Sequence, residues 1–177
     1  MKARSVALLR GINVGKAKRV AMADLRALFE GLGYTDVATL LNSGNVVFTG
    51  ARGKAAGVAR RIEGAIEERC GFASRVTIVS GADLARVLEE NPLAKEADDP
   101  SRMMIGFLQD AAGLRALREL ARQDWGRERL ALGPRALYVW CPKGVIDSAP
   151  MKALQKQLGE GWTARNRATV EKLAELA

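Results

Sequence analysis

The sequence predicts an α+β protein made of two ferredoxin-like (βαββαβ) halves with antiparallel sheets, plus an extra linking helix and a C-terminal helix. Two observations support this fold class. Short apolar runs alternate with amphipathic segments of helical period, and the order strand, helix, strand, strand, helix, strand occurs twice. We expect a first subdomain over residues 1–80, a linking helix and linker over 81–100, and a second subdomain with the terminal helix over 101–177.

The first half combines four short apolar strands with two amphipathic helices. In the first helix, Leu25, Leu28 and Phe29 recur at helical spacing, and Gly31 or Gly33 is expected to end it. Gly71 is expected to end the second helix. The strands are expected over residues 3–9, 37–41, 46–49 and 75–79, and the helices over 22–32 and 54–69.

The second half repeats this order after a linking helix. Ser80 and Asp83 have capping-box spacing, so the linking helix is expected to start there and to end at Asn91-Pro92. Ser148 is expected to cap a later helix that carries Pro150 in its first turn. The other expected elements are strands over 102–108, 129–132, 136–140 and 162–165, a helix over 111–124, and a C-terminal helix containing Val170 and Leu173.

The composition excludes several classes of function. Hydrophobic residues make up 48% and charged residues 27%, which is typical of a soluble protein with a core. The apolar runs are too short for a membrane span or a signal peptide, so we expect a cytoplasmic protein without membrane contact. The absence of histidine excludes Ser-His-Asp and Cys-His catalysis. Cys70 and Cys141 lack paired spacing, so we expect reduced thiols, no metal site and no cofactor.

Positive charge is concentrated at the start of the chain. The net charge is +8, and six cations precede the first acidic residue, Asp24. Such a cluster attracts phosphates or acidic surfaces, although a merely solubilising face remains the alternative. The six cations are Lys2, Arg4, Arg10, Lys16, Lys18 and Arg19.

Topology predicts that two polar segments lie together. In the βαββαβ order, the loop after the first strand, the hairpin between the second and third strands, and the turn before the fourth strand emerge at the same edge of the sheet. The polar segments of the first two are Gly11-Ile12-Asn13-Val14-Gly15-Lys16 and Asn42-Ser43-Gly44-Asn45. The candidate ligand-binding residues at this edge are Arg10, Gly11, Asn13, Gly15, Lys16, Asn42, Ser43 and Asn45.

The glycine-bracketed loop differs from a P-loop, which has four residues between its glycines and Ser or Thr after the lysine. Here three residues separate Gly11 and Gly15, and Ala17 follows Lys16. An anion nest built from backbone N–H groups is one interpretation. In the other, the glycines permit turns, Asn13 caps local backbone and the hairpin residues serve only the turn.

A third polar cluster, Arg165-Asn166-Arg167, lies near the C-terminus. Arg165 and Asn166 are added to the candidate ligand-binding residues; in the alternative interpretation, Asn166 only caps the last helix. The aromatic residues do not alternate with basic ones, which argues against a stacking platform for single-stranded nucleic acid.

Several of these segments resemble one bacterial family, the domain of unknown function 1697 family. They include Leu8-Leu9-Arg10-Gly11-Ile12-Asn13-Val14-Gly15, Val20-Ala21-Met22-Ala23-Asp24-Leu25-Arg26, Leu32-Gly33-Tyr34, Asn42-Ser43-Gly44-Asn45-Val46-Val47-Phe48, Asn91-Pro92-Leu93 and Thr163-Ala164-Arg165-Asn166 with Thr169-Val170. The resemblance implies a cytoplasmic bacterial protein with a two-part, ferredoxin-related fold, and it assigns no activity. Two residues depart from the family pattern: Lys16 stands where a second glycine is common, and Arg167 replaces a usual tryptophan.

The leading hypothesis is a binding protein for a phosphate-bearing or anionic ligand, either a nucleotide or a nucleic acid. The alternatives are a small enzyme without a cofactor, in which Asp24 shares an edge with the polar amides, and a structural or protein-interaction module. No residue pair marks a general base, so whether the protein is an enzyme stays open at the level of sequence, as do its ligand and its oligomeric state.

Overall fold

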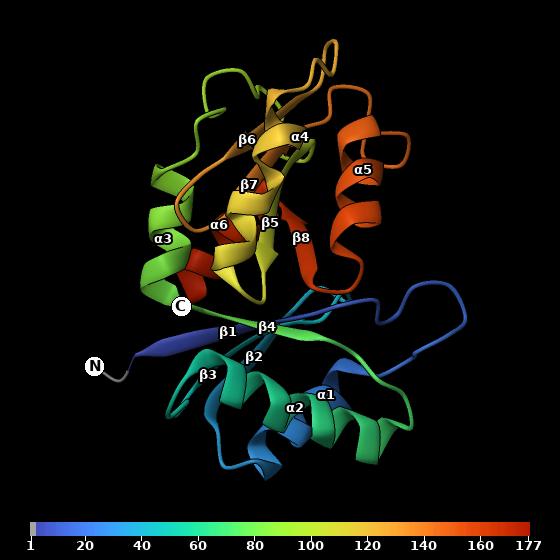
Figure 1. Ribbon diagram of the computed structural model, residues 1–177. Helices are drawn as coiled ribbons and strands as arrows, with labels where there is room; N and C mark the ends of the chain where they lie inside the picture. The colour runs from blue at the N-terminus through green and yellow to red at the C-terminus, as the bar shows by residue number, and fades with distance from the viewer. Residues whose placement is uncertain (1–2) are drawn as a thin grey trace. The chain divides into compact units, whose positions relative to one another are not determined.

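The computed structural model describes residues 3–177 (Figure 1). The chain divides into two compact units, the first formed by Met1–Ala82 with Leu173–Ala177 and the second by Asp83–Lys172. Each unit contains one four-stranded antiparallel sheet, which confirms the predicted α+β fold of two halves. Among residues 3–177, no helix has both the length and the apolar character that crossing a membrane requires.

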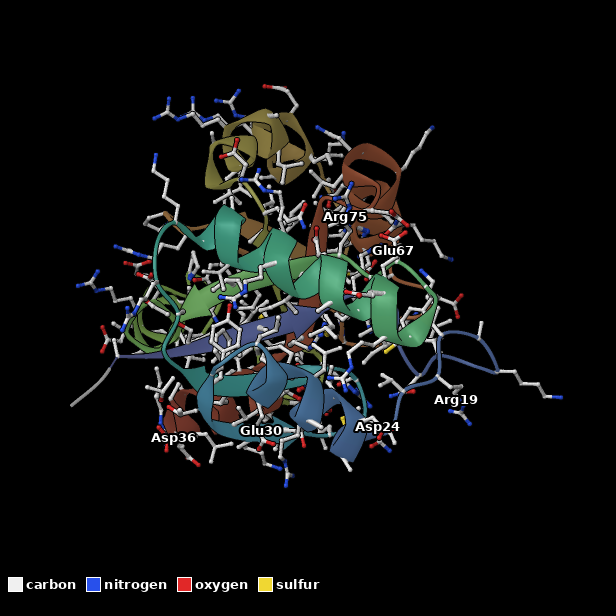
Figure 2. The ribbon with its side chains drawn as sticks, turned by 90° about the horizontal axis from the view of Figure 1, so that it is seen from below. Arg19, Asp24, Glu30, Asp36, Glu67 and Arg75 are labelled. Atoms are coloured by element: carbon white, nitrogen blue, oxygen red, sulfur yellow. The ribbon has the colours of Figure 1, made fainter. Side chains whose placement is uncertain are left out.

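The first unit has the strand order of a ferredoxin-like fold. Its sheet runs β2-β3-β1-β4, and every neighbouring pair is antiparallel. Helices α1 and α2 lie side by side on one face of this sheet (Figures 1 and 2). The elements are β1 (Arg4–Leu9), α1 (Met22–Gly31), β2 (Thr35–Leu40), β3 (Asn45–Thr49), α2 (Ala55–Cys70) and β4 (Val76–Ser80).

An apolar core fixes the two helices to the first sheet. Alternate residues of β1 and β3, including Leu9 and Phe48, face Phe29 of α1 and Ile62 of α2, and each of these four side chains is at most 1% exposed. The Phe48 ring lies 5.2 Å from that of Phe29 and 4.6 Å from that of Tyr34, measured between centroids. Burying a side chain of this size contributes roughly 1.5–3 kcal/mol. The core therefore holds the start of α1, and the loop before it, in a defined place.

The predicted glycine stops are confirmed in the first unit. Gly71 follows α2 with φ +73°, and its N–H donates to the Glu67 carbonyl at 3.0 Å. Gly33 follows α1 with φ +86°. Both have the left-handed conformation that glycine adopts most readily at the end of a helix.

The second unit repeats the same topology. Its sheet runs β6-β7-β5-β8, again antiparallel throughout. Ser148 caps α5 by accepting from the Met151 N–H at 3.4 Å, as predicted. Asn166 caps α6 by accepting from the Thr169 N–H at 2.9 Å, which is one of the two interpretations that the sequence left open. The remaining elements of the chain are α3 (Gly81–Glu89), β5 (Met103–Leu108), η1 (Ala111–Leu117), α4 (Arg118–Arg122), β6 (Arg129–Leu132), β7 (Leu137–Trp140), α5 (Ala149–Leu158), β8 (Trp162–Asn166) and α6 (Arg167–Leu176), and the last residues of α6 belong to the first unit.

One predicted helix differs from the structure. The segment expected to be a continuous α-helix over 111–124 is a 3₁₀-helix, η1, followed by the short α4. Asp110 caps its start by accepting from the Ala112 N–H at 2.9 Å. Gly113 packs so tightly against β5 that an added Cβ would lie 2.9 Å from Leu108 Cδ2. Close approach to the strand accompanies the tighter winding, and apolar spacing alone does not distinguish the two helix types.

Opposite faces of the second sheet contact different helices. Leu137 and Val139 pack with Leu117 of η1 and Leu154 of α5. Tyr138, which lies between them in β7, is fully buried and donates its hydroxyl to the Val87 carbonyl of α3 at 2.6 Å. Because neighbouring side chains of β7 point to opposite faces of the sheet, Tyr138 contacts α3 on the face opposite to Leu137 and Val139.

Candidate functional site

Three connections of the first unit meet at one edge of its sheet, as the topology predicts. The Leu9 N–H donates to the Gly44 carbonyl at 2.8 Å, which joins β1 to the β2–β3 turn. Ser74 Oγ donates to the Arg10 carbonyl at 2.9 Å, which joins the α2–β4 connection to the β1–α1 loop. We call these three segments, residues 10–21, 41–44 and 71–75, the loop edge.

Asn13 ties the β1–α1 loop to itself and to the β2–β3 turn. Its Nδ2 donates to the Val20 carbonyl at 3.0 Å and to the Asn42 carbonyl at 2.9 Å, while its Oδ1 accepts from the Val20 N–H at 2.9 Å. The residue has φ +53°, a left-handed conformation that asparagine tolerates better than most residues. Both hydrogens of the amide are therefore committed to backbone carbonyls.

Asn45 has a comparable role inside the β2–β3 turn. It is fully buried, and its Nδ2 donates to the Leu40 carbonyl at 2.9 Å and to Ser43 Oγ at 3.0 Å. Ser43 and Asn42 are themselves exposed. The buried amide closes the turn that carries these two residues.

Gly44 allows the turn to pack directly on the β1–α1 loop. Its φ is +83°, and an added Cβ would lie 2.7 Å from Ile12 Cδ1 and 2.8 Å from Leu9 Cβ. Gly11 and Gly15 also have positive φ, of +67° and +62°, but an added Cβ on either would meet no atom within 4 Å. Gly44 is thus required for close packing, whereas the other two glycines are required for backbone conformation alone.

The cationic side chains of the β1–α1 loop are on the surface. Lys18 Nζ donates to the Ala73 carbonyl at 2.9 Å, which anchors the far side of the loop. Lys16 and Arg19 are exposed and form no ion pair with a carboxylate in the described part of the chain. Val14 is 71% exposed beside them, and Figure 2 shows Arg19 on the loop as it extends away from α1 and α2.

Charge differs strongly between the two units. The first unit has 13 Lys and Arg against 7 Asp and Glu, a net charge of +6. The second has 15 against 13, a net charge of +2. Most of the excess positive charge of the protein therefore belongs to the unit that carries the loop edge.

Arg165 and Asn166 belong to the second unit, whereas the loop edge belongs to the first. Arg165 Nη1 donates to Thr163 Oγ1 and to the Ala164 carbonyl, both at 2.8 Å. Asn166 uses its Oδ1 as the cap of α6. The contacts of Asn166 agree with the capping interpretation of this cluster.

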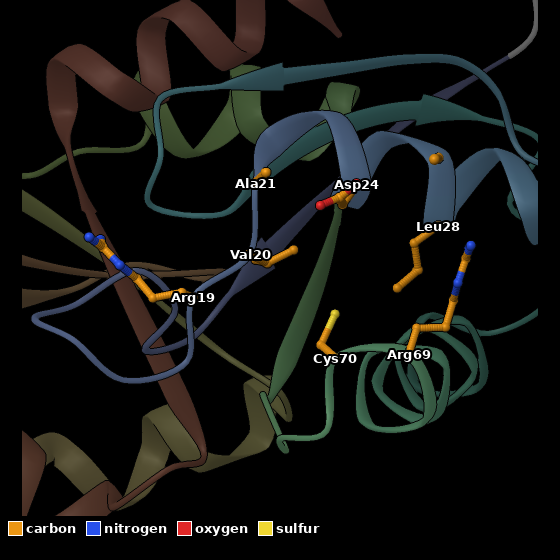
Figure 3. A pocket seen from close by; sticks show the side chains of 8 residues that line it. Arg19, Val20, Ala21, Asp24, Leu28, Arg69 and Cys70 are labelled. Carbon is orange, nitrogen blue, oxygen red and sulfur yellow. The ribbon is translucent and has the colours of Figure 1, made fainter.

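Sequence reasoning missed a cavity between α1 and the end of α2. It has a volume of about 440 Å³, and Asp24, Arg69 and Cys70 are among its lining residues, whereas Asn13 and Asn45 are not (Figure 3). Burial raises the pKa of the Cys70 thiol; nearby Arg69 opposes this effect and Asp24 adds to it. The one signal in the sequence was the position of Cys70 at the end of a helix. Among residues 3–177, no group of three or more Cys, Asp or Glu is arranged to hold a metal ion.

Comparisons with known proteins give the family and a structural relative. The family model described as "Protein of unknown function (DUF1697)" matches residues 2–138. The structure of a conserved bacterial protein, SP0830 from Streptococcus pneumoniae, is similar over 99% of each chain, with 28% sequence identity and a TM-score of 0.79. No curated protein matches the chain.

Proposed function

We propose that this chain, which belongs to the DUF1697 family of proteins of unknown function, binds the phosphate backbone of a nucleic acid through the loop edge of its first unit. The observation that carries the proposal is the concentration of charge. The first unit has a net charge of +6, and Lys16 and Arg19 project from a loop whose base is held by hydrogen bonds. Exposed cations on a projecting loop suit an extended polyanion, because they reach phosphates without enclosing a ligand.

The hydrogen bonds of Asn13 and Asn45 favour recognition of the phosphate backbone of a nucleic acid over recognition of its bases. The two Asn13 amide hydrogens and those of Asn45 are already used by protein acceptors, so these groups are not available to read a base edge. Affinity should therefore depend on salt and only weakly on sequence. If three phosphates are neutralised, raising the salt concentration from 50 to 200 mM should weaken binding roughly 40-fold.

Fluorescence anisotropy with a labelled 20-base-pair duplex tests this proposal. The double variant Lys16→Ala/Arg19→Ala should weaken binding and flatten the dependence on salt. The matched control is Arg52→Ala/Lys54→Ala, which removes the same charge from the β3–α2 connection at the opposite edge of the sheet and should have a smaller effect. Equal losses of duplex affinity in the two double variants would reject the loop edge as the site. An affinity that does not change with salt concentration would reject it as well. Binding of a mononucleotide with the affinity of the duplex would indicate a small-ligand site instead.

A structural or protein-interaction role is a second candidate. The specific observation in its favour is that Asn13 bonds to backbone of the loop edge and Asn45 bonds to the Leu40 carbonyl at the end of β2. It predicts that Lys16→Ala/Arg19→Ala binds the duplex as the unmodified protein does, whereas Asn13→Ala only lowers the melting temperature. The two candidates thus differ in which variant changes binding.

A further inference from the structure

The cavity between α1 and α2, which shares Arg19 with the loop edge, has the size of a small-ligand site. Its volume of about 440 Å³ lies within the range usual for such sites. Val20 lines it from the β1–α1 loop, Ala27 and Leu28 from α1, and Cys70 from the end of α2. Both helices are fixed by the core of the first unit, so the cavity belongs to a rigid part of the fold.

Charged side chains of alternating sign are arranged along this cavity. Figure 3 shows Arg19 at one end, Arg69 at the other and Asp24 between them. Arg69 lies beside the last turn of α1, where an added Cβ on Gly31 would be 3.5 Å from Arg69 Nη1. None of the three charged side chains forms an ion pair within residues 3–177. Each is therefore open to a charged group of a ligand.

The Cys70 thiol forms a neutral wall of the cavity. In Figure 3 it points toward the Asp24 carboxylate across the open space. Burial raises its pKa above the ordinary value of 9.0, so the thiol remains protonated at neutral pH. A protonated thiol is a weak nucleophile, which favours reversible binding over a covalent step.

We infer that this cavity binds a small zwitterion that carries a primary ammonium group and a phosphate or carboxylate group a few bonds apart. The ammonium group pairs with Asp24, and the anionic group pairs with Arg69. A plain anion leaves Asp24 without a partner and brings a like charge near it. A plain cation has the same disadvantage with respect to Arg69 and Arg19. The alternating signs thus select for both charges in one molecule.

A matched pair of probes separates a zwitterion from a plain anion. O-phosphoethanolamine and ethyl phosphate share the phosphate ester and differ by one ammonium group. NMR titration of the full-length protein should show saturable shifts at Asp24 and Cys70 and about fivefold tighter binding of O-phosphoethanolamine, the preference that one exposed ion pair supplies. Equal affinity for the two probes would overturn the inference, as would shifts confined to other residues.

Substitutions of Asp24 and Arg69 test which side chain pairs with each charged group of the probe. Asp24→Asn should remove the preference for O-phosphoethanolamine, and Arg69→Met should weaken binding of both probes. The control is Arg26→Met, which removes an exposed cation of α1 that does not line the cavity. It should change neither the affinity for the two probes nor the preference between them. A preference that survives Asp24→Asn would reject the assigned role of the carboxylate.

Protection of Cys70 gives a second readout. Iodoacetamide should alkylate Cys70 more slowly when O-phosphoethanolamine is present, while the buried Cys141 stays unmodified in both cases. An unchanged rate at a saturating probe concentration would place the ligand elsewhere. Arg19 lies at both sites, but Asp24 and Arg69 lie outside the loop edge, so their variants test the cavity separately from the duplex experiment.

Discussion

Replacing Gly44 with alanine tests how the loop edge is assembled. Gly44 has φ +83°, and its added Cβ would lie 2.7 Å from Ile12 Cδ1 and 2.8 Å from Leu9 Cβ. The end of the Ile12 side chain can move, but Leu9 Cβ is attached directly to the β1 backbone. The substitution therefore pushes the β2–β3 turn away from the β1–α1 loop.

Two destabilising contributions add in the Gly44→Ala variant. A non-glycine residue with positive φ costs about 1–2 kcal/mol, and overpacking of a buried contact costs about 1–3 kcal/mol. Gly44→Ala should thus lower the free energy of unfolding by about 2–5 kcal/mol. Gly15→Ala is the matched control, because Gly15 has φ +62° but no atom within 4 Å of an added Cβ. Gly15→Ala should therefore be destabilised only by the cost of positive φ, about 1–2 kcal/mol.

Urea unfolding followed by far-UV circular dichroism measures the difference. All three tryptophans lie in the second unit, so fluorescence is the wrong probe for this substitution. In a chain of this length each kcal/mol corresponds to about 2–4 °C of melting temperature. Combining Gly44→Ala with Ile12→Val removes Cδ1 and should recover part of the loss in a double-mutant cycle. Equal destabilisation by Gly44→Ala and Gly15→Ala would refute the close packing.

Three other substitutions probe hydrogen bonds and charge. Asn13→Ala removes three hydrogen bonds at about 1 kcal/mol each and should destabilise the first unit by about 2–3 kcal/mol in urea unfolding. Arg135→Met removes the ion-pair partner of partly buried Glu90 and should lower the urea midpoint of the second unit, measured by tryptophan fluorescence. Burial raises the pKa of Tyr138, so native protein keeps this proton above pH 10, where the unfolded chain loses it. Stability should therefore hold below about pH 10 and fall above it, and Tyr138→Phe should weaken that fall.

The fold was predictable because local signals and topology agreed. Leu25 and Phe29 recur at helical spacing and are buried in α1, and Gly71 ends α2 where its conformational freedom is needed. The βαββαβ order then placed the β1–α1 loop beside the β2–β3 turn, and the hydrogen bond from Asn13 to Asn42 shows that they meet. Strand alternation and loop direction require no knowledge of side-chain packing, so a sequence is sufficient for them.

Features that depend on packing distances were not predictable. The tight winding of η1 accompanies the approach of Gly113 to Leu108, which apolar spacing does not encode. The α1–α2 cavity brings Asp24 near Cys70, and their proximity depends on how two helices pack on the sheet. The direction of the Asn13 amide was equally open, since asparagine serves a ligand or a backbone carbonyl with the same atoms.

The residues of the loop edge fall into two groups with different roles. Asn13 and Gly44 hold the backbone, and neither leaves a charged group for a ligand. Lys16 and Arg19 form no ion pair with a carboxylate in the described part of the chain, and they supply the exposed charge. The family resemblance implies that glycine is common at the position of Lys16, so part of the exposed charge is expected to be particular to this chain. If charge determines binding as proposed, relatives with glycine at this position should keep the same loop structure and hold a polyanion less tightly.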